Sequence, residues 1–174
     1  MLSALVVLSS VTFAQLGLNA IGVGAGFVSV SNDVGSGLLL GAGADLGELS
    51  KGLHLRPDVG YWSVSKTAGG VEVKSSDFSI NANVIYQIPS GGQMSPFYLG
   101  GGLGLNMVTA EAAVTFLGTS IKSSASNSRI GINLLAGAGV PIGPKMMLHG
   151  EARYVLVSDF NHFGIMAGIA FLLK

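Results

Sequence analysis

The sequence lacks cysteine, is poor in charge and has no basic patch. The absence of cysteine excludes disulfide bonds and thiolate metal sites. Charged residues make up 10% of the 174 residues, against roughly 25% in an ordinary soluble domain. Because the formal net charge is zero and no basic patch is present, nucleic acid is not expected as a partner.

Long apolar runs are also missing. No stretch reaches the ~18 apolar residues of an ordinary transmembrane helix. Yet the mean hydropathy is +0.59 and the chain contains 27 glycines. The apolar residues must therefore be interleaved with others, and interleaving with a period of two is typical of a membrane β-barrel.

The first residues, MLSALVVLSSVTFAQ, form a short apolar segment that includes Thr12-Phe13-Ala14. This segment resembles the core of a signal peptide with cleavage after Ala14, and a buried first strand or helix is the alternative interpretation. We expect residues 1–14 to be a signal peptide and residues 15–174 to form one barrel domain.

From Gln15 onward the sequence divides into about eight segments with period-two alternation, each bounded by Gly, Pro, Ser, Asn or Asp. The segments are 16–30, 37–47, 53–62, 77–88, 96–107, 129–140, 147–157 and 162–173. An even number of strands of this length predicts an all-β fold, an eight-stranded antiparallel up-and-down transmembrane β-barrel. The barrel must close, because an open sheet edge in hydrocarbon would leave backbone groups unpaired.

We expect the apolar face of each strand to contact lipid and the polar face to line the interior. The polar face is rich in glycine, which suits the narrow interior of an eight-stranded barrel. All three arginines and all three histidines lie on it, whereas five of the six lysines fall in predicted turns or loops. Arginine suits buried ion pairs and lysine suits solvent. A soluble barrel with its apolar face inward is the alternative, and it would not sort the charges in this way.

Aromatic residues of the apolar face lie near the strand ends, with Leu, Ile, Val and Ala between them. This arrangement predicts two aromatic belts at the membrane interfaces. The predicted girdle residues are Phe27, Tyr61, Phe78, Tyr86, Phe97, Tyr154, Phe163 and Phe171.

Short turns alternate with longer loops along the chain. Short turns are typical of the periplasmic side and longer loops of the extracellular side, so both chain ends are expected to be periplasmic. The two longest predicted extracellular loops are 65–76 and 109–128. The second contains AAVTFLGTSI, which predicts an extension of its hairpin beyond the membrane.

The segments RPDVGYW, SPFYLGGGLGLN, LLAGAGV, LHGEARY and GIMAGIAFLL resemble the small eight-stranded outer-membrane β-barrel family. This is the group of porin-like opacity proteins and of the barrel half of outer-membrane protein A. The resemblance covers essentially the whole mature chain. It implies the barrel fold and a location in the bacterial outer membrane, whereas its degenerate motifs specify no function.

Charged side chains of the polar face form the main candidate site, for which a structural role is predicted. The predicted interior polar network consists of Asp45, His54, Arg56, Asp58, Asp77, Arg129, His149, Glu151 and Arg153. We interpret it as an ion-pair plug, because a buried charge needs a partner of opposite sign. An ion path or gate is the alternative.

Metal and catalytic sites are not expected. His54 and His149 share a depth, but His162 begins a strand at the opposite end, so the three histidines cannot converge. For a lipid A-modifying enzyme the nearest serine, acid and histidine candidates are Ser158, Asp159 and His162. The stretch SDFNH lacks the compact His-x-Ser arrangement of barrel deacylases.

The sequence therefore predicts a non-enzymatic outer-membrane barrel without cofactors, with a structural or surface-interaction role. Its expected partners are outer-membrane lipids and an extracellular molecule bound through residues 65–76 and 109–128. We expect a monomer. A narrow pore for small solutes or ions is the main alternative function.

Overall fold

The computed structural model describes residues 16–31, 34–68, 71–88, 97–116, 119–158 and 160–173. The expected signal peptide at 1–14 lies outside them. The described residues form nine strands: β1 (Ala20–Val30), β2 (Gly35–Asp45), β3 (Glu48–Ser50), β4 (Leu53–Ala68), β5 (Val71–Gln87), β6 (Phe97–Phe116), β7 (Thr119–Gly143), β8 (Met146–Leu156) and β9 (His162–Leu172). Within these ranges, no helix is long and apolar enough to cross a bilayer.

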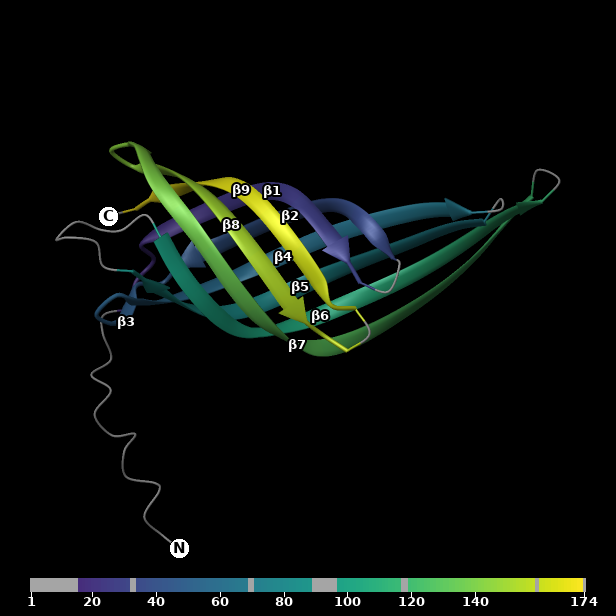
Figure 1. Ribbon diagram of the computed structural model, residues 1–174, viewed down its shortest axis with the longest axis horizontal. Helices are drawn as coiled ribbons and strands as arrows, with labels where there is room; N and C mark the ends of the chain where they lie inside the picture. The colour runs from purple at the N-terminus through teal and green to yellow at the C-terminus, as the bar shows by residue number, and fades with distance from the viewer. Residues whose placement is uncertain are drawn as a thin grey trace, which may run out of the picture.

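The strands form one closed antiparallel sheet (Figure 1). β1 pairs with both β2 and β9, and β4 pairs with both β2 and β5. The short β3 pairs with the first residues of β4, and β2 pairs with later residues of the same strand. β2 and β3 therefore share one position in the ring, which has eight positions. The prediction of an eight-stranded antiparallel barrel is confirmed.

A kink separates β2 from β3 at the end of the barrel that carries the chain termini. Gly47 has a φ of 96°, a conformation that residues with a Cβ rarely adopt. Its N–H donates a 2.7 Å hydrogen bond to Asp45 Oδ1. This turn holds the Asp45 carboxylate over the interior, beside the start of β4.

Polarity is inverted relative to a soluble barrel. Large apolar side chains point outward, for example Phe27 with 72% of its surface exposed and Ile130 with 75%. Polar side chains point inward, and Asn83 and Asn133 are fully buried. The prediction that the apolar face is the outer one is therefore correct.

Inward glycines make room for the large inward side chains. Asn83 lies opposite Gly102 and Asn81 opposite Gly104, Tyr98 lies opposite Gly137, and His149 lies opposite Gly168. In each pair, a Cβ added to the glycine would overlap the partner's side chain. The glycine-rich face thus packs by pairing a large residue with an empty position on the next strand.

Most described residues of the two segments predicted as loops, 65–76 and 109–128, are strand, and the hairpin extension predicted for the second segment is present. β4 and β5 remain paired up to Ala68 and Val71, and β6 and β7 up to Phe116 and Thr119. β5 also pairs with β6 up to Val71 and Val114. Residues 64–68, 71–75, 109–116 and 119–127 therefore form a four-stranded projecting sheet, seen in Figure 1 at the end opposite the termini. Alternation of small polar and apolar residues continues across these segments, and adjacent strands satisfy each other's backbone groups.

An apolar cluster lies in the interior at the base of the projecting sheet. Its buried members are Val28, Val30, Trp62 and Val64, which are 1%, 5%, 2% and 3% exposed. Val34, Leu39 and Phe160 pack against them. We refer to these seven residues as the apolar cap.

Glycine positions inside and outside the barrel are expected to differ in tolerance. Gly102→Ala places a methyl group against Asn83 and the Ala82 carbonyl, and overpacking of this kind costs about 1–3 kcal/mol. Gly150→Ala meets no atom within 4 Å and serves as the matched control. The temperature at which the folded, faster-migrating gel band disappears should fall for Gly102→Ala alone; equal values for both variants would contradict the packing argument.

Candidate functional site in the barrel interior

Two arginines and two carboxylates form the centre of the interior. Arg153 donates from Nη1 to Asp58 Oδ1 at 2.7 Å and from Nη2 to Asp58 Oδ2 at 2.9 Å. It also donates from Nε and Nη2 to Glu151 Oε1, at 3.2 and 2.9 Å. Paired bonds of this type use the planar fork of the guanidinium and fix its orientation.

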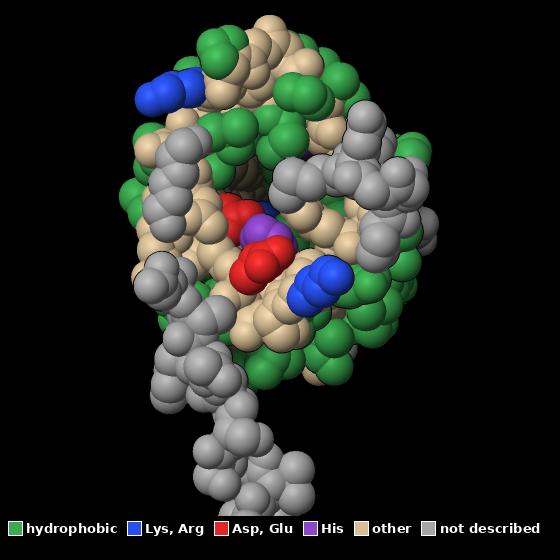
Figure 2. Space-filling view, turned by 90° about the vertical axis from the view of Figure 1, so that its left-hand side faces the viewer, with side chains coloured by type: hydrophobic (Ala, Val, Ile, Leu, Met, Phe, Trp, Pro, Cys, Tyr) green, Lys and Arg blue, Asp and Glu red, His purple; other side chains and the backbone are tan. Residues whose placement is uncertain are grey.

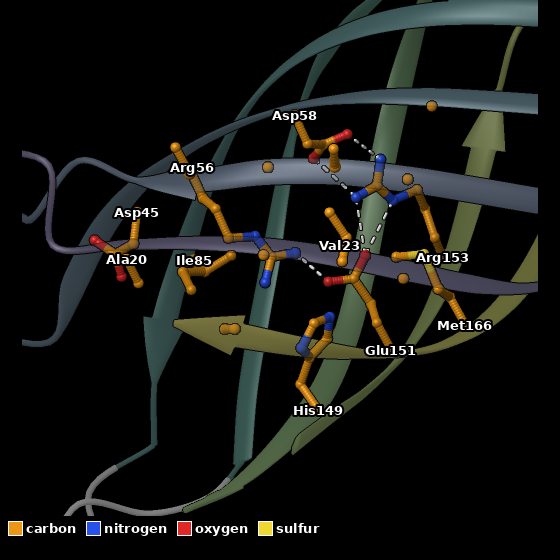
Figure 3. Close-up of a pocket in the computed structure, with 18 of the residues that line it drawn as sticks. Ala20, Val23, Asp45, Arg56, Asp58, Ile85, His149, Glu151, Arg153 and Met166 are labelled. Carbon is orange, nitrogen blue, oxygen red and sulfur yellow. Dashed lines mark hydrogen bonds and ion pairs between the residues drawn. The ribbon is translucent and has the colours of Figure 1, made fainter. Parts of the chain in front are cut away.

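Glu151 joins this pair to a second arginine. Its Oε2 accepts a hydrogen bond from Arg56 Nη2 and one from the Tyr98 hydroxyl at 2.9 Å. The Arg56 guanidinium also lies over the Tyr98 ring, 5.0 Å from its centroid. We call Arg56, Asp58, Glu151 and Arg153 the ion-pair bridge (Figure 3).

The ion-pair bridge spans the full width of the barrel. Arg56 and Asp58 belong to β4, and Glu151 and Arg153 belong to β8. In the closed ring, β5, β6 and β7 separate β4 from β8 on one side, and β2, β1 and β9 on the other. The bridge therefore joins opposite walls and divides the interior into two halves.

One half is packed. Asn81 and Asn83 donate to the two Asp58 oxygens at 2.8 and 2.6 Å, and Asn133 Nδ2 donates to both of their side-chain oxygens at 3.0 Å. Nearer the termini, Ile85, Tyr98 and Leu135 form a buried cluster. The amide network satisfies the remaining lone pairs of Asp58, which a buried carboxylate requires.

The other half is open. A cavity of about 840 Å³ runs past the ion-pair bridge, and its opposite wall is formed by β1, β2 and β9. This wall carries small inward residues, among them Gly22, Gly41 and Gly43, together with Met166. The cavity is in the size range of small-molecule pockets. The bridge thus crosses the barrel without filling its cross-section.

A histidine with two acidic neighbours lies at the mouth of this cavity. His54 Nδ1 is 3.0 Å from Asp45 Oδ2, and Nε2 is 3.5 Å from Glu48 Oε1. Figure 2 shows this end of the molecule hollowed at its centre, with acidic and histidine side chains beside the opening. Because the two carboxylates approach opposite ring nitrogens, they do not converge on one point as metal ligands would.

The remaining network candidates are dispersed. Asp77 is buried on β5 opposite Trp62, and Arg129 lies on β7 opposite Asn106, both toward the projecting sheet. His149 lines the cavity near Arg56 (Figure 3). Across the described ranges, no group of three or more candidate ligands could hold a metal ion.

The two described candidate catalytic residues, Ser158 and His162, lie in different surroundings. His162 is buried, its Nδ1 lies 3.1 Å from the Phe160 carbonyl oxygen, and its ring packs edge-on against Trp62. Ser158 is exposed, and Asp159 lies outside the described residues. The histidine ring is thus held by contacts that face the interior.

The eight predicted girdle residues all lie on the outer surface, with exposed fractions from 39% for Tyr154 to 72% for Phe27. Two pairs sit directly across neighbouring strands, Tyr61 opposite Phe78 and Tyr154 opposite Phe163. Such cross-strand aromatic pairs stabilise a sheet.

Sequence reasoning missed the neutral members of the interior. Asn81, Asn83, Asn133 and Tyr98 all lie on the polar face, but they carry no charge that would mark them. A signal was available, because each of Asn81, Asn83 and Tyr98 faces an inward glycine on the next strand. Trp62 was also on the polar face, and its role in the apolar cap was not predicted.

Comparison with known proteins gives one family and several structures. The family described as outer membrane protein beta-barrel domain matches residues 1–171. Neisserial surface protein A is 20% identical with a TM-score of 0.62, covering 88% of this chain and 96% of that one. Ail, the attachment invasion locus protein of Yersinia pestis, is 13% identical with a TM-score of 0.57, covering 88% and 98%.

The N-terminal β-barrel domain of Pseudomonas aeruginosa OprF is also similar in structure. It is 14% identical with a TM-score of 0.53, and the match covers 89% of this chain and 98% of that one. At these identities the three structures support the fold alone. No curated protein matched the sequence.

Breaking the ion-pair bridge should destabilise the barrel strongly. Arg153→Met leaves Asp58 without its paired bonds, and an unpaired buried charge costs about 3–5 kcal/mol. Lys145→Met, at an exposed turn residue, is the matched control. The free energy of unfolding in urea, measured in lipid vesicles, should fall for Arg153→Met and stay near wild type for Lys145→Met.

Removing both partners provides a further check. The double variant Arg153→Met/Asp58→Leu should recover part of the loss, because no charge is then left without its main partner. If the double variant is no more stable than Arg153→Met, the pairing does not explain the effect.

Proposed function

The chain belongs to the outer membrane protein β-barrel family and is an integral barrel of the bacterial outer membrane, and we propose that it is a surface-interaction protein whose barrel anchors the projecting sheet outside the cell. The long hairpins lie opposite the end that bears the termini, the end expected to be periplasmic. The ion-pair bridge then has a structural role. The projecting sheet is the observation that carries this proposal.

The projecting sheet is accessible to a binding partner outside the cell. Residues 123–128 of β7 are all exposed, on both faces of the strand. β7 pairs with β8 only from Ile132 onward, so among the described residues its segment 119–128 has no strand on its outer edge. An open edge of this length offers unpaired N–H and C=O groups to an added strand.

The two faces of the projecting sheet differ. Alternation from the buried Ser75 and Asp77 places Val73 on the face that continues the interior, and Val73 is 44% exposed there. By the same alternation this face carries Val73, Ala110, Ala112 and Ala125, together with Lys66 and Ser123. The opposite face carries Lys74, Thr109, Glu111, Ser124 and Ser126. We therefore propose that the partner is an extended polypeptide segment that adds to β7 with alternating apolar side chains.

A non-enzymatic role is part of the proposal. Support comes from the interior position of His162, whose ring contacts Trp62, while Ser158 is on the surface. Two of the similar structures carry names of surface or attachment proteins. A mass shift of lipid A on expression of the protein would contradict this part of the proposal.

Trimming one hairpin tests the proposed interaction. Replacing residues 110–125 by Asn-Gly leaves Thr109 and Ser126, whose hydroxyls lie 2.8 Å apart, joined by a tight turn. Peptides selected from a phage-displayed random library on the full-length barrel in lipid nanodiscs should bind the trimmed variant roughly tenfold more weakly or worse, a loss of about 1.4 kcal/mol or more.

The matched control replaces residues 66–73 by Asn-Gly, which shortens the β4–β5 hairpin and leaves the outer edge of β7 at 119–128 in place. This variant should keep most of the affinity. Equal loss in both variants, or selected peptides without apolar alternation, would contradict pairing along β7.

A further inference from the structure

The interior cavity ends at a defined level. Its lining residues nearest the projecting sheet are Leu39, Trp62, Val155 and His162. At the other end it is lined by Ala20, Asp45, His54 and Leu172, where Figure 2 shows the hollow. The cavity therefore opens toward the termini and stops below the projecting sheet.

The contact between Trp62 and His162 crosses the interior at that level. The ring centroids are 5.5 Å apart, with the rings at 61°. Trp62 is on β4 and His162 on β9, and the ring order places β2 and β1 between them. The two side chains thus reach across the open half of the barrel, above the glycine-lined wall.

The apolar cap lies on the same half. Val28 and Val30 come from β1, Leu39 from β2, and Trp62 and Val64 from β4, while Phe160 precedes β9. Val28 and Val64 are 1% and 3% exposed. These side chains pack together in the part of the cross-section that the ion-pair bridge leaves open.

We propose that the apolar cap is the permeability barrier of this barrel, and that the cavity below it is a water-filled vestibule continuous with the periplasm. An apolar constriction blocks ions because water does not fill it, and a charged ion would have to shed its hydration to pass. The ion-pair bridge holds the walls together, and water and small ions reach past it along β1, β2 and β9. The inference is independent of the proposed surface interaction.

Conductance of the full-length protein in planar lipid bilayers shows whether the apolar cap or the ion-pair bridge blocks the passage of ions. Trp62→Ala should raise the ionic conductance roughly tenfold or more over wild type, because it removes the side chain that reaches across the open half. The double variant Arg56→Gln/Glu151→Gln neutralises one arm of the bridge and should conduct like wild type. Conductance from the bridge variant, with none from Trp62→Ala, would overturn the proposal.

A conservative pair guards against misfolding of Trp62→Ala. Val28→Thr/Val64→Thr keeps side-chain shape and adds hydroxyls that attract water to the apolar cap. This variant should also conduct, with a folded gel band like that of wild type. If Trp62→Ala and Val28→Thr/Val64→Thr both fold and neither conducts, the barrier lies elsewhere.

Thiol labelling tests the vestibule directly, since the chain has no cysteine of its own. Ser79 lines the cavity, Ser75 is 7% exposed opposite Val64, and Ser65 is exposed on the outer face. With a small charged thiol reagent, Ser79→Cys should react within roughly tenfold of Ser65→Cys, and Ser75→Cys far more slowly, because ions enter wetted but not apolar regions. Equal protection of Ser79→Cys and Ser75→Cys would overturn the vestibule.

Discussion

Closure of the sheet is the constraint on which the rest of the structure depends. In hydrocarbon each backbone N–H and C=O must find a partner within the protein, and the β1–β9 and β2–β4 pairings complete the ring. A ring of eight positions is narrow, so inward side chains compete for a small volume. The alternation of glycine with large polar residues follows from this. Tyr98 can reach Glu151 because Gly137 on the neighbouring strand leaves its space empty.

The same strands meet two solvents along their length, and their side-chain pattern changes where the solvent does. In the barrel, β6 presents Leu103 and Leu105 to lipid and buries Asn106. Farther along, the outward positions are Thr109 and Glu111. Nothing in the backbone marks the change, since pairing with β7 continues without a shift in register. Secondary structure is therefore set by continuous pairing, and the membrane boundary is set by which face is apolar.

The fold and the inward face were accessible from the sequence because each depends on period-two alternation within one strand, and the same alternation placed the predicted girdle side chains on the outer surface. The ion-pair bridge was accessible only as a set of charges, since pairing Arg56 with Glu151 requires knowing that β4 and β8 face each other across the ring. Strand continues through much of 65–76, which was predicted as a loop because serine and glycine are typical of loops. At 109–128 the stretch AAVTFLGTSI did predict an extended hairpin, and that extension is present. The open half of the interior had no sequence signal. An inward glycine leaves room either for a large side chain of a neighbouring strand or for a cavity, and the sequence does not distinguish the two.

Ion pairs and apolar packing have different roles in the barrel interior. Arg56, Asp58, Glu151 and Arg153 need one another, because each would be costly if buried alone. Their attraction joins opposite walls, but a cavity remains beside them. An apolar cap cannot join walls by strong directional bonds, yet under our proposal it excludes water where Val28 and Val64 pack with Trp62. The bridge therefore joins opposite walls, and the apolar cap is the part of the interior to which we assign the barrier against water and ions.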